Sequence, residues 1–100
     1  MSVLAKRLRE ARLVAGLSQE RLGVLAGIDE ASASARMNQY ERGKHEPDWL
    51  TVQNIASVLK VPVAYFYADD AEAELLLAFN ALPVEAREEA VRTLRRKAHR

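Results

Sequence analysis

The chain has 100 residues, of which 49% are hydrophobic and 29% charged, with a formal net charge of +1 and no cysteine. This length favours one domain with its own core, and the composition is typical of a globular protein. The missing cysteines exclude disulfides, thiolate zinc sites and cysteine nucleophiles, and the longest apolar stretch, 75–79, is far shorter than the roughly 20 residues of a membrane span.

The charges are sorted along the chain, although their sum is close to zero. A basic start is followed, after a mixed middle, by an acidic segment over 69–89 and a basic end. The basic side chains are Lys6, Arg7, Arg9 and Arg12 at the start and Arg92, Arg95, Arg96, Lys97 and Arg100 at the end. Phosphate contact depends on local charge. Each basic end is therefore either a phosphate-binding surface or a solvated helix face.

Two helices are predicted at the start of the chain. An amphipathic helix over 3–15, ending at Gly16, is indicated by apolar residues at spacings of three and four, namely Leu4, Leu8, Ala11 and Ala15. Ser18 is a good N-cap for a second helix over 19–26, which Gly27 ends. Because a helix of about two turns is unstable alone, we expect it to pack against its neighbours.

A third helix ends near Arg42, but its start is ambiguous. Asp29, Ser32 and Ser34 are each suitable N-caps, and the choice moves the start by more than one turn. Two further elements follow a polar loop. A helix over 48–60 is indicated by apolar residues at helical spacing, namely Val52, Ile55, Ala56 and Leu59. Pro62 fits the first position of a short fifth helix that ends at Tyr67.

The last third of the chain predicts a helical hairpin. Pro83 separates two apolar stripes, formed by Leu75, Leu76, Phe79 and Leu82 and by Ala86, Ala90, Val91 and Leu94. No alternating run is long enough to predict a strand. We therefore expect an all-α fold in which residues 1–68 form one domain and residues 69–100 a helical hairpin.

The third helix has the composition that reading DNA requires. Met37 and Tyr40 can pack inward, while polar side chains that suit base edges remain outside, namely Ser34, Arg36, Asn38 and Gln39. A solvated polar face has the same composition, so this helix alone does not decide its role.

Several spaced motifs decide it together. The runs LREARLVAGLSQERLGVLAG, NQYERGKHEPD and LTVQNIASVLKVPVAYFYA resemble, over about residues 3–67, the lambda-repressor-like (Cro/repressor, xenobiotic-response-element type) helix-turn-helix family. The family's Ser-Gln pair is seen as Ser18 and Gln19, its Glu-Arg-Gly-Lys as 41–44 and its Leu-x-Val-Pro as 59–62, with Pro47 ahead of the fourth helix.

The resemblance implies a five-helix DNA-binding domain that places the helix ending near Arg42 in the major groove. The residues that match the family's positions imply base contacts from Ser34, Arg36, Asn38 and Gln39, phosphate contacts from Ser18, Gln19, Arg42 and Lys44, and a structural pair between Arg12 and Glu41. The family binds near-palindromic sites as homodimers, so we expect a transcriptional regulator, most simply a repressor.

One segment departs from the family pattern. Between Gly27 and Met37 the chain is about four residues longer, which is close to one helical turn. The extra residues either extend the recognition helix at its N-terminus or form a bulge in the turn. An extended helix would bring Ser32 or Glu30 toward DNA.

The hairpin leaves two questions open. Its first apolar stripe, which exceeds what a five-helix core needs, either forms a dimer interface or folds back on its own domain; the residues are Leu75, Leu76, Phe79 and Leu82. Its acidic segment also fits an alternative function, a protein-interaction or antitoxin-like module that binds a protein partner through 69–100. Steep salt dependence of DNA binding distinguishes the two functions.

No enzyme, metal or cofactor site is predicted. His45 and His99 are the only histidines, and no acidic residue joins both at ligand spacing. Ser32 and Ser34 lack a general base that would make either a nucleophile. With no signal-peptide core at the start of the chain, we expect a cytoplasmic protein without membrane contact.

Overall fold

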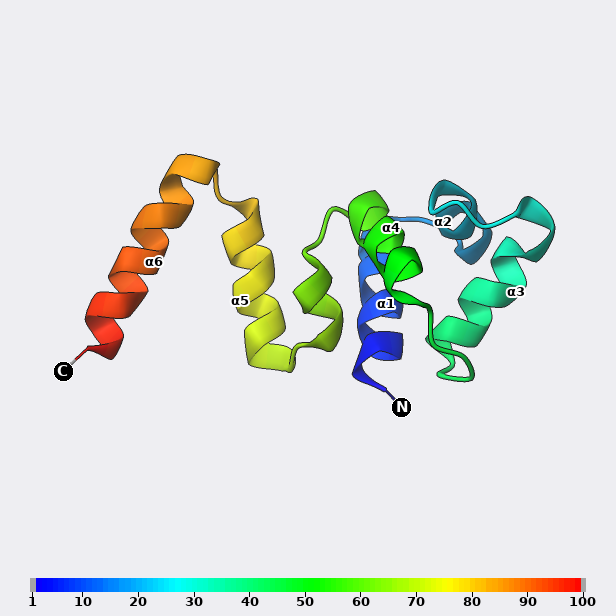
Figure 1. The fold of residues 1–100 in the computed structure, drawn as a ribbon, viewed down its shortest axis with the longest axis horizontal. Coiled ribbons are helices and arrows are strands. Elements are labelled where there is room, and N and C mark those ends of the chain that lie inside the picture. Colours follow the sequence, from blue (N-terminus) through cyan, green and yellow to red (C-terminus); the bar gives the residue numbers. More distant parts are fainter. Residues whose placement is uncertain (1, 100) are drawn as a thin grey trace.

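The computed structural model describes residues 2–99, which form six α-helices and one 3-10 helix and no strand (Figure 1). The elements in chain order are α1 (Val3–Val14), α2 (Gln19–Leu25), α3 (Glu30–Glu41), α4 (Trp49–Leu59), η1 (Val63–Tyr67), α5 (Asp70–Ala81) and α6 (Val84–Ala98). The molecule is elongated, with extents of 54 × 27 × 22 Å, and α3 and α6 lie toward opposite ends. The predicted all-α fold is confirmed.

Capping side chains start most of the helices, and Ser18 is one that the sequence predicts. Ser18 Oγ accepts a hydrogen bond from the Arg21 amide at 3.0 Å, and Asp48 Oδ1 accepts one from the Thr51 amide at 2.8 Å. Asp69 and Glu72 form a reciprocal capping box at the start of α5. These bonds satisfy amide groups that the first turn of a helix leaves without partners.

The core lies between the first five elements. The largest fully buried side chains come one from each element, namely Leu8, Leu22, Met37, Ile55 and Phe66. Full burial of a side chain of this size stabilises the fold by about 1.5–3 kcal/mol. The core therefore depends on all five elements packing together, which supports the short α2 and η1.

The extra residues before Met37 extend α3 at its N-terminus and do not form a bulge in the turn. α3 begins at Glu30, and the side chain of Asp29 accepts a hydrogen bond from the Ala31 amide at 3.2 Å. Ala33, in the added turn, is fully buried one turn before Met37. Of the three candidate N-caps, the structure uses Asp29.

α2 and α3 approach each other unusually closely at Gly23. A Cβ atom at Gly23 would lie 2.8 Å from Ala33 Cβ and 3.1 Å from Met37 Cγ. Such distances leave no room for a side chain at position 23. The glycine therefore allows α3 to pack this closely against α2.

The fifth element differs in detail from its prediction. It is a 3-10 helix over Val63–Tyr67, and Pro62 precedes it in extended backbone instead of occupying its first position. Tyr65 and Phe66 are both buried, with their rings edge to face at 5.5 Å. A 3-10 helix of five residues forms only a short, tight turn. That turn places the two rings in the core.

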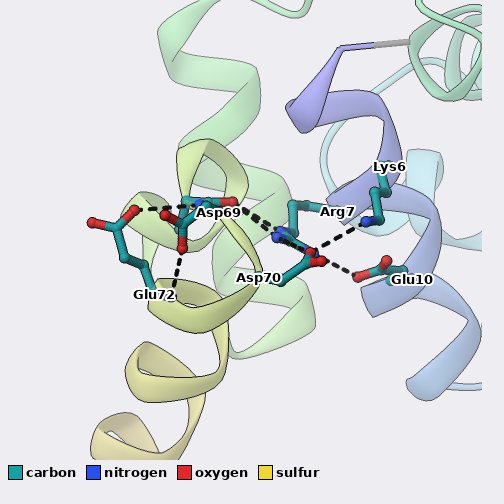
Figure 2. A network of polar contacts seen from close by, with 7 residues as sticks. Lys6, Arg7, Glu10, Asp69, Asp70 and Glu72 are labelled. Carbon is teal, nitrogen blue, oxygen red and sulfur yellow. Dashed lines mark hydrogen bonds and ion pairs between the residues drawn. The ribbon is translucent and has the colours of Figure 1, made fainter.

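Arg7, one of the basic residues at the start of the chain, fits neither predicted alternative, because it is neither a phosphate contact nor a solvated side chain. Its side chain is buried, with 4% of the residue exposed. It donates two hydrogen bonds to the Ala68 carbonyl at 2.9 and 3.1 Å and one to Asp70 Oδ1 at 2.8 Å, as Figure 2 shows. These two partners lie more than 60 positions away in the sequence, whereas a third, Glu10, lies on α1 itself. Arg7 therefore fastens α5 to α1 and cannot contact phosphate.

Asp70 shares its carboxylate between Arg7 and Lys6, whose Nζ lies 3.2 Å away (Figure 2). The hydrogen bond from Arg7, followed by that from Lys6, holds the pKa of Asp70 below its ordinary value. A carboxyl group with a lowered folded-state pKa contributes stability above its unfolded pKa, about 4, and loses it as pH falls through the folded value.

Asp70→Asn should therefore make the protein less stable at neutral pH, and its deficit against the wild type should shrink below about pH 4. Chemical unfolding at pH 7 and pH 3 measures both differences. Glu74→Gln is the matched control, because it removes the same charge one turn further along α5. An Asp70→Asn deficit that stayed constant with pH would contradict the assigned role of this carboxylate.

The hairpin is attached to the core through α5 alone. Ala73 is buried, Leu76 packs against the core, and Asn80 donates a hydrogen bond to the Lys60 carbonyl at 3.1 Å. α6 buries none of its residues and stands apart at the end of the molecule (Figure 1). Leu76 packs against its own core, which agrees with a stripe that folds back on its own domain. Leu75 is exposed, which agrees with a stripe that forms a dimer interface.

Candidate nucleic-acid interface

α3 has one buried and one open face. Ala33, Met37, Tyr40 and Glu41 are buried against the other helices. The opposite face is formed at helical spacing by Ala31, Ala35, Gln39 and, just past the last turn, Arg42. A helix with a fixed inner face and short or polar outer side chains suits entry into the major groove.

Ser34 and Arg36, two of the predicted base contacts, are both exposed. Arg36 is held against its own helix, because its Nη2 donates a hydrogen bond to the Tyr40 hydroxyl at 2.9 Å and its guanidinium lies 5.9 Å from the centre of that ring. Contact with a base would require Arg36 to leave Tyr40.

Asn38 and Gln39, the other two predicted base contacts, differ in their side-chain hydrogen bonds. Asn38 is half-buried and its side-chain oxygen accepts a hydrogen bond from the Gln19 amide at 3.4 Å, which links α3 to α2. Gln39 is half-buried too, but its side chain makes no hydrogen bond within residues 2–99. Of the two amides, Gln39 is the one available to a ligand.

Arg12 and Glu41 form a bidentate ion pair between α1 and α3. Arg12 Nε and Nη2 donate to the Glu41 carboxylate at 2.6 and 3.0 Å, and Nη1 donates to the Leu17 carbonyl at 2.9 Å. The hydrogen bond to Glu41 holds the pKa of Arg12 above its ordinary value. Gln19 donates a further bond to the same carboxylate at 3.3 Å. The pair therefore joins the first three helices.

A polar hollow lies beside this pair. Its lining comes from α1, the start of α2 and the end of α3, namely Arg9, Arg12, Ser18, Gln19, Asn38, Glu41 and Arg42. Glu41 neutralises Arg12, which leaves the charge of Arg9 and Arg42, both exposed. Two of the predicted phosphate contacts, Ser18 and Gln19, share the hollow with Arg42. Its positive charge is suited to an anion.

The fourth predicted phosphate contact, Lys44, lies outside the hollow in the turn after α3. Its side chain is exposed, and its backbone amide donates a hydrogen bond to the Gln39 carbonyl at 2.9 Å. That bond, with Gly43 in the left-handed region at a φ of 70°, closes the end of the helix. Lys44 is therefore held close to the outward face of α3.

The sequence interpretation missed three residues of this surface. Arg9 is one of the basic residues at the start of the chain, but no motif predicts a contact for it. Its position about one turn before Arg12 does not indicate one either. Ala31 and Ala35 carry no polar group, so composition gave no sign of them. Alanine methyl groups can nevertheless contact the methyl group of thymine.

Other kinds of site find little support within residues 2–99. These residues contain no group of three or more His, Cys, Asp or Glu side chains that could hold a metal ion. Among them, too, no helix combines the length and the apolar character that crossing a bilayer demands.

The arrangement of α2, the turn at Gly27 and α3 against α1 and α4 is that of a helix-turn-helix unit. The family described as "Helix-turn-helix domain" matches residues 3–65, and the chain belongs to this family of transcriptional regulators. The resemblance read from the motifs is confirmed.

Known relatives extend this identification. Over 66 residues the chain is 35% identical to an "Uncharacterized HTH-type transcriptional regulator" of Sinorhizobium medicae (strain WSM419) and to another of Rhizobium meliloti (strain 1021). The match covers 66% of this chain but only 45% of the relatives' length. The structure is similar to the crystal structure of the transcriptional regulator BswR, with a TM-score of 0.85 and 47% identity, covering 96% of this chain and 94% of that one. This likeness includes the hairpin.

Proposed function

We propose that the protein is a sequence-specific transcriptional regulator, most simply a repressor, that inserts α3 into the major groove of DNA. The observation that carries the proposal is the arrangement of α3, whose buried face is fixed by Met37 and Tyr40 while its outward face stays open. Because its relatives are described as transcriptional regulators, we propose a binding protein and not an enzyme, acting in the cytoplasm.

Base reading is assigned to Gln39, Arg36, Ser34 and Asn38. A glutamine amide pairs with adenine and an arginine with guanine, each pair favouring the correct base by about 1–3 kcal/mol. Gln39 is the first candidate because its amide has no partner within residues 2–99. Arg36 contributes after exchanging the Tyr40 hydroxyl for a base.

Phosphate contact is assigned to the polar hollow and to the turn after α3. Arg9 and Arg42 supply charge, Ser18 and Gln19 supply hydrogen bonds, and Lys44 lies in the turn that follows Arg42 at the same end of α3. These contacts hold the helix in register on the duplex without reading its sequence.

A single module of this size contacts few base pairs, so we propose that a homodimer binds a near-palindromic operator. In this proposal residues 1–68 form the DNA-binding domain and residues 69–100 the dimerisation extension.

The test is a fluorescence-anisotropy titration of DNA selected from a random library, compared with scrambled DNA at two salt concentrations. The wild type should prefer the selected DNA by about a thousandfold. Gln39→Ala with Arg36→Ala should reduce that preference about thirtyfold or more, because each change removes one base contact of about 1–3 kcal/mol. Gln53→Ala, at an exposed glutamine of α4, is the matched control and should keep the preference.

Arg42→Gln separates phosphate contact from base reading. It should weaken binding to both DNAs alike and lower the salt slope by about 1. If the wild type binds weakly and without regard to sequence, the proposal fails, and the interaction-module function of the hairpin becomes the better explanation.

A further inference from the structure

The cleft between α5 and α6 is an apolar surface that the chain leaves uncovered. α5 lines it with Leu75, Phe79 and Leu82, and α6 with Ala86, Ala90 and Leu94, around an open volume of about 500 Å³. Leu75 is 52% exposed and Leu94 49% exposed. Because a single helix of this length is marginal in water, α6 requires a partner on this face.

The cleft is held open by contacts at its closed end. Arg87, on the first turn of α6, donates hydrogen bonds to the Leu82 carbonyl at 3.1 Å and to the Asn80 carbonyl at 2.8 Å. Its guanidinium lies 5.6 Å from the centre of the Phe79 ring. These bonds occupy the carbonyl groups at the end of α5 and fix where α6 leaves it.

The charges of α6 are complementary to a reversed copy of the same helix. Its first half carries Glu85, Glu88 and Glu89 together with Arg87, which is bound to carbonyl groups at the end of α5, and its second half carries Arg92, Arg95, Arg96 and Lys97 without an acidic residue. Glu89 lines the cleft yet forms no ion pair within residues 2–99. A parallel pair of α6 helices would set like charges against each other, whereas an antiparallel pair matches opposite ones.

The acidic start of α5 does not offer α6 an equivalent partner. Asp70 is bound by Arg7 and Lys6, and Glu72 is part of the capping box. Only Glu74 remains on that helix for the basic end of α6. Closure of the hairpin on itself would therefore satisfy less charge than pairing with a second copy.

We propose that the cleft is covered by a second copy of this chain, whose α6 lies antiparallel to α6. A two-fold symmetric interface of this kind places the same residues on both sides. The inference deepens the homodimer of the proposed function, and its test uses the full chain without DNA so that the two can fail separately.

Sedimentation velocity over a wide range of protein concentration measures the association. The wild type should be a dimer, and Leu94→Glu should weaken dimerisation about a hundredfold, since it places a charge in the apolar contact. Val14→Glu, at a residue 90% exposed on α1, is the matched control and should leave the dimer intact. Circular dichroism verifies that both variants keep the helices of the core, to which α6 contributes no buried residue.

The orientation is measured by pulsed electron paramagnetic resonance on spin-labelled single-cysteine variants, which the cysteine-free sequence makes straightforward. Labels are placed at Arg92→Cys, near the middle of α6, or at Lys97→Cys, near its end. In an antiparallel pair the Lys97 labels should be about 10 Å farther apart than the Arg92 labels, because each residue advances 1.5 Å along the helix.

Equal distances at the two positions would overturn the antiparallel arrangement. A monomeric wild type, or a dimer that Leu94→Glu leaves unchanged, would overturn the cleft as the interface. A monomer that still recognises selected DNA would refute this inference and the proposed homodimer, and would leave only the recognition of DNA by α3 standing.

Discussion

Arg12→Ala should lower the free energy of unfolding by about 3–5 kcal/mol, because it leaves a carboxylate buried without its ion-pair partner. The Glu41 side chain is only 3% exposed and that of Arg12 only 11%, so water cannot replace the lost guanidinium easily. The Leu17 carbonyl also loses a donor. Denaturant unfolding measures the change, which is a large part of the 5–15 kcal/mol that holds a typical domain folded.

The neighbouring Arg9→Ala provides the comparison. Arg9 is exposed and forms no ion pair within residues 2–99, so its removal should change stability by about 0.5 kcal/mol or less. Arg12→Ala combined with Glu41→Gln should cost less than the sum of the two single changes, since the second removes the unpaired charge. Additive costs would mean that the pair contributes no coupling.

Local pattern predicted the helices well where each signal lies within a few residues. The α1 helix ends one residue before its predicted limit, and α6 begins directly after Pro83, the predicted break between the two apolar stripes. Caps and apolar spacing are local properties, so they are visible in the sequence.

The start of α3 was not predictable in the same way. Asp29, Ser32 and Ser34 are chemically equivalent N-caps, and the structure favours the earliest because Ala33 is then buried against Gly23 of α2. That contact depends on a pair of residues from two helices, and no signal within α3 reports it.

The candidate site shows the same division. The family motifs pick out most of its side chains and the Arg12–Glu41 pair, but not Arg9, Ala31 or Ala35, and the other contacts were not predicted. Arg7 has the same charge as Arg9 and sits two positions away, yet the structure buries one against Asp70 and exposes the other. The bond of Arg36 to Tyr40, at a spacing of four on one helix, is the contact that spacing alone could have suggested.

Gly23→Val should destabilise the protein by about 3 kcal/mol or more, because the branched side chain has no space between α2 and α3. Its Cβ would meet Ala33 Cβ at 2.8 Å and the Ala33 carbonyl oxygen at 3.1 Å, and neither atom belongs to a flexible side chain. The better helix propensity of valine over glycine, a few tenths of a kcal/mol, does not offset this clash. Thermal and denaturant unfolding measure the loss.

Glu20→Val, at an exposed position of the same helix, controls for valine in α2 and should change little. Adding Ala33→Gly to Gly23→Val should recover part of the lost stability, since it removes the nearest methyl group. A Gly23→Val protein as stable as the wild type would show that α2 and α3 can separate freely. The α3 helix would then not be held rigidly by this contact, and the position of its outward face would depend on buried Met37 and Tyr40 and on the Arg12–Glu41 pair.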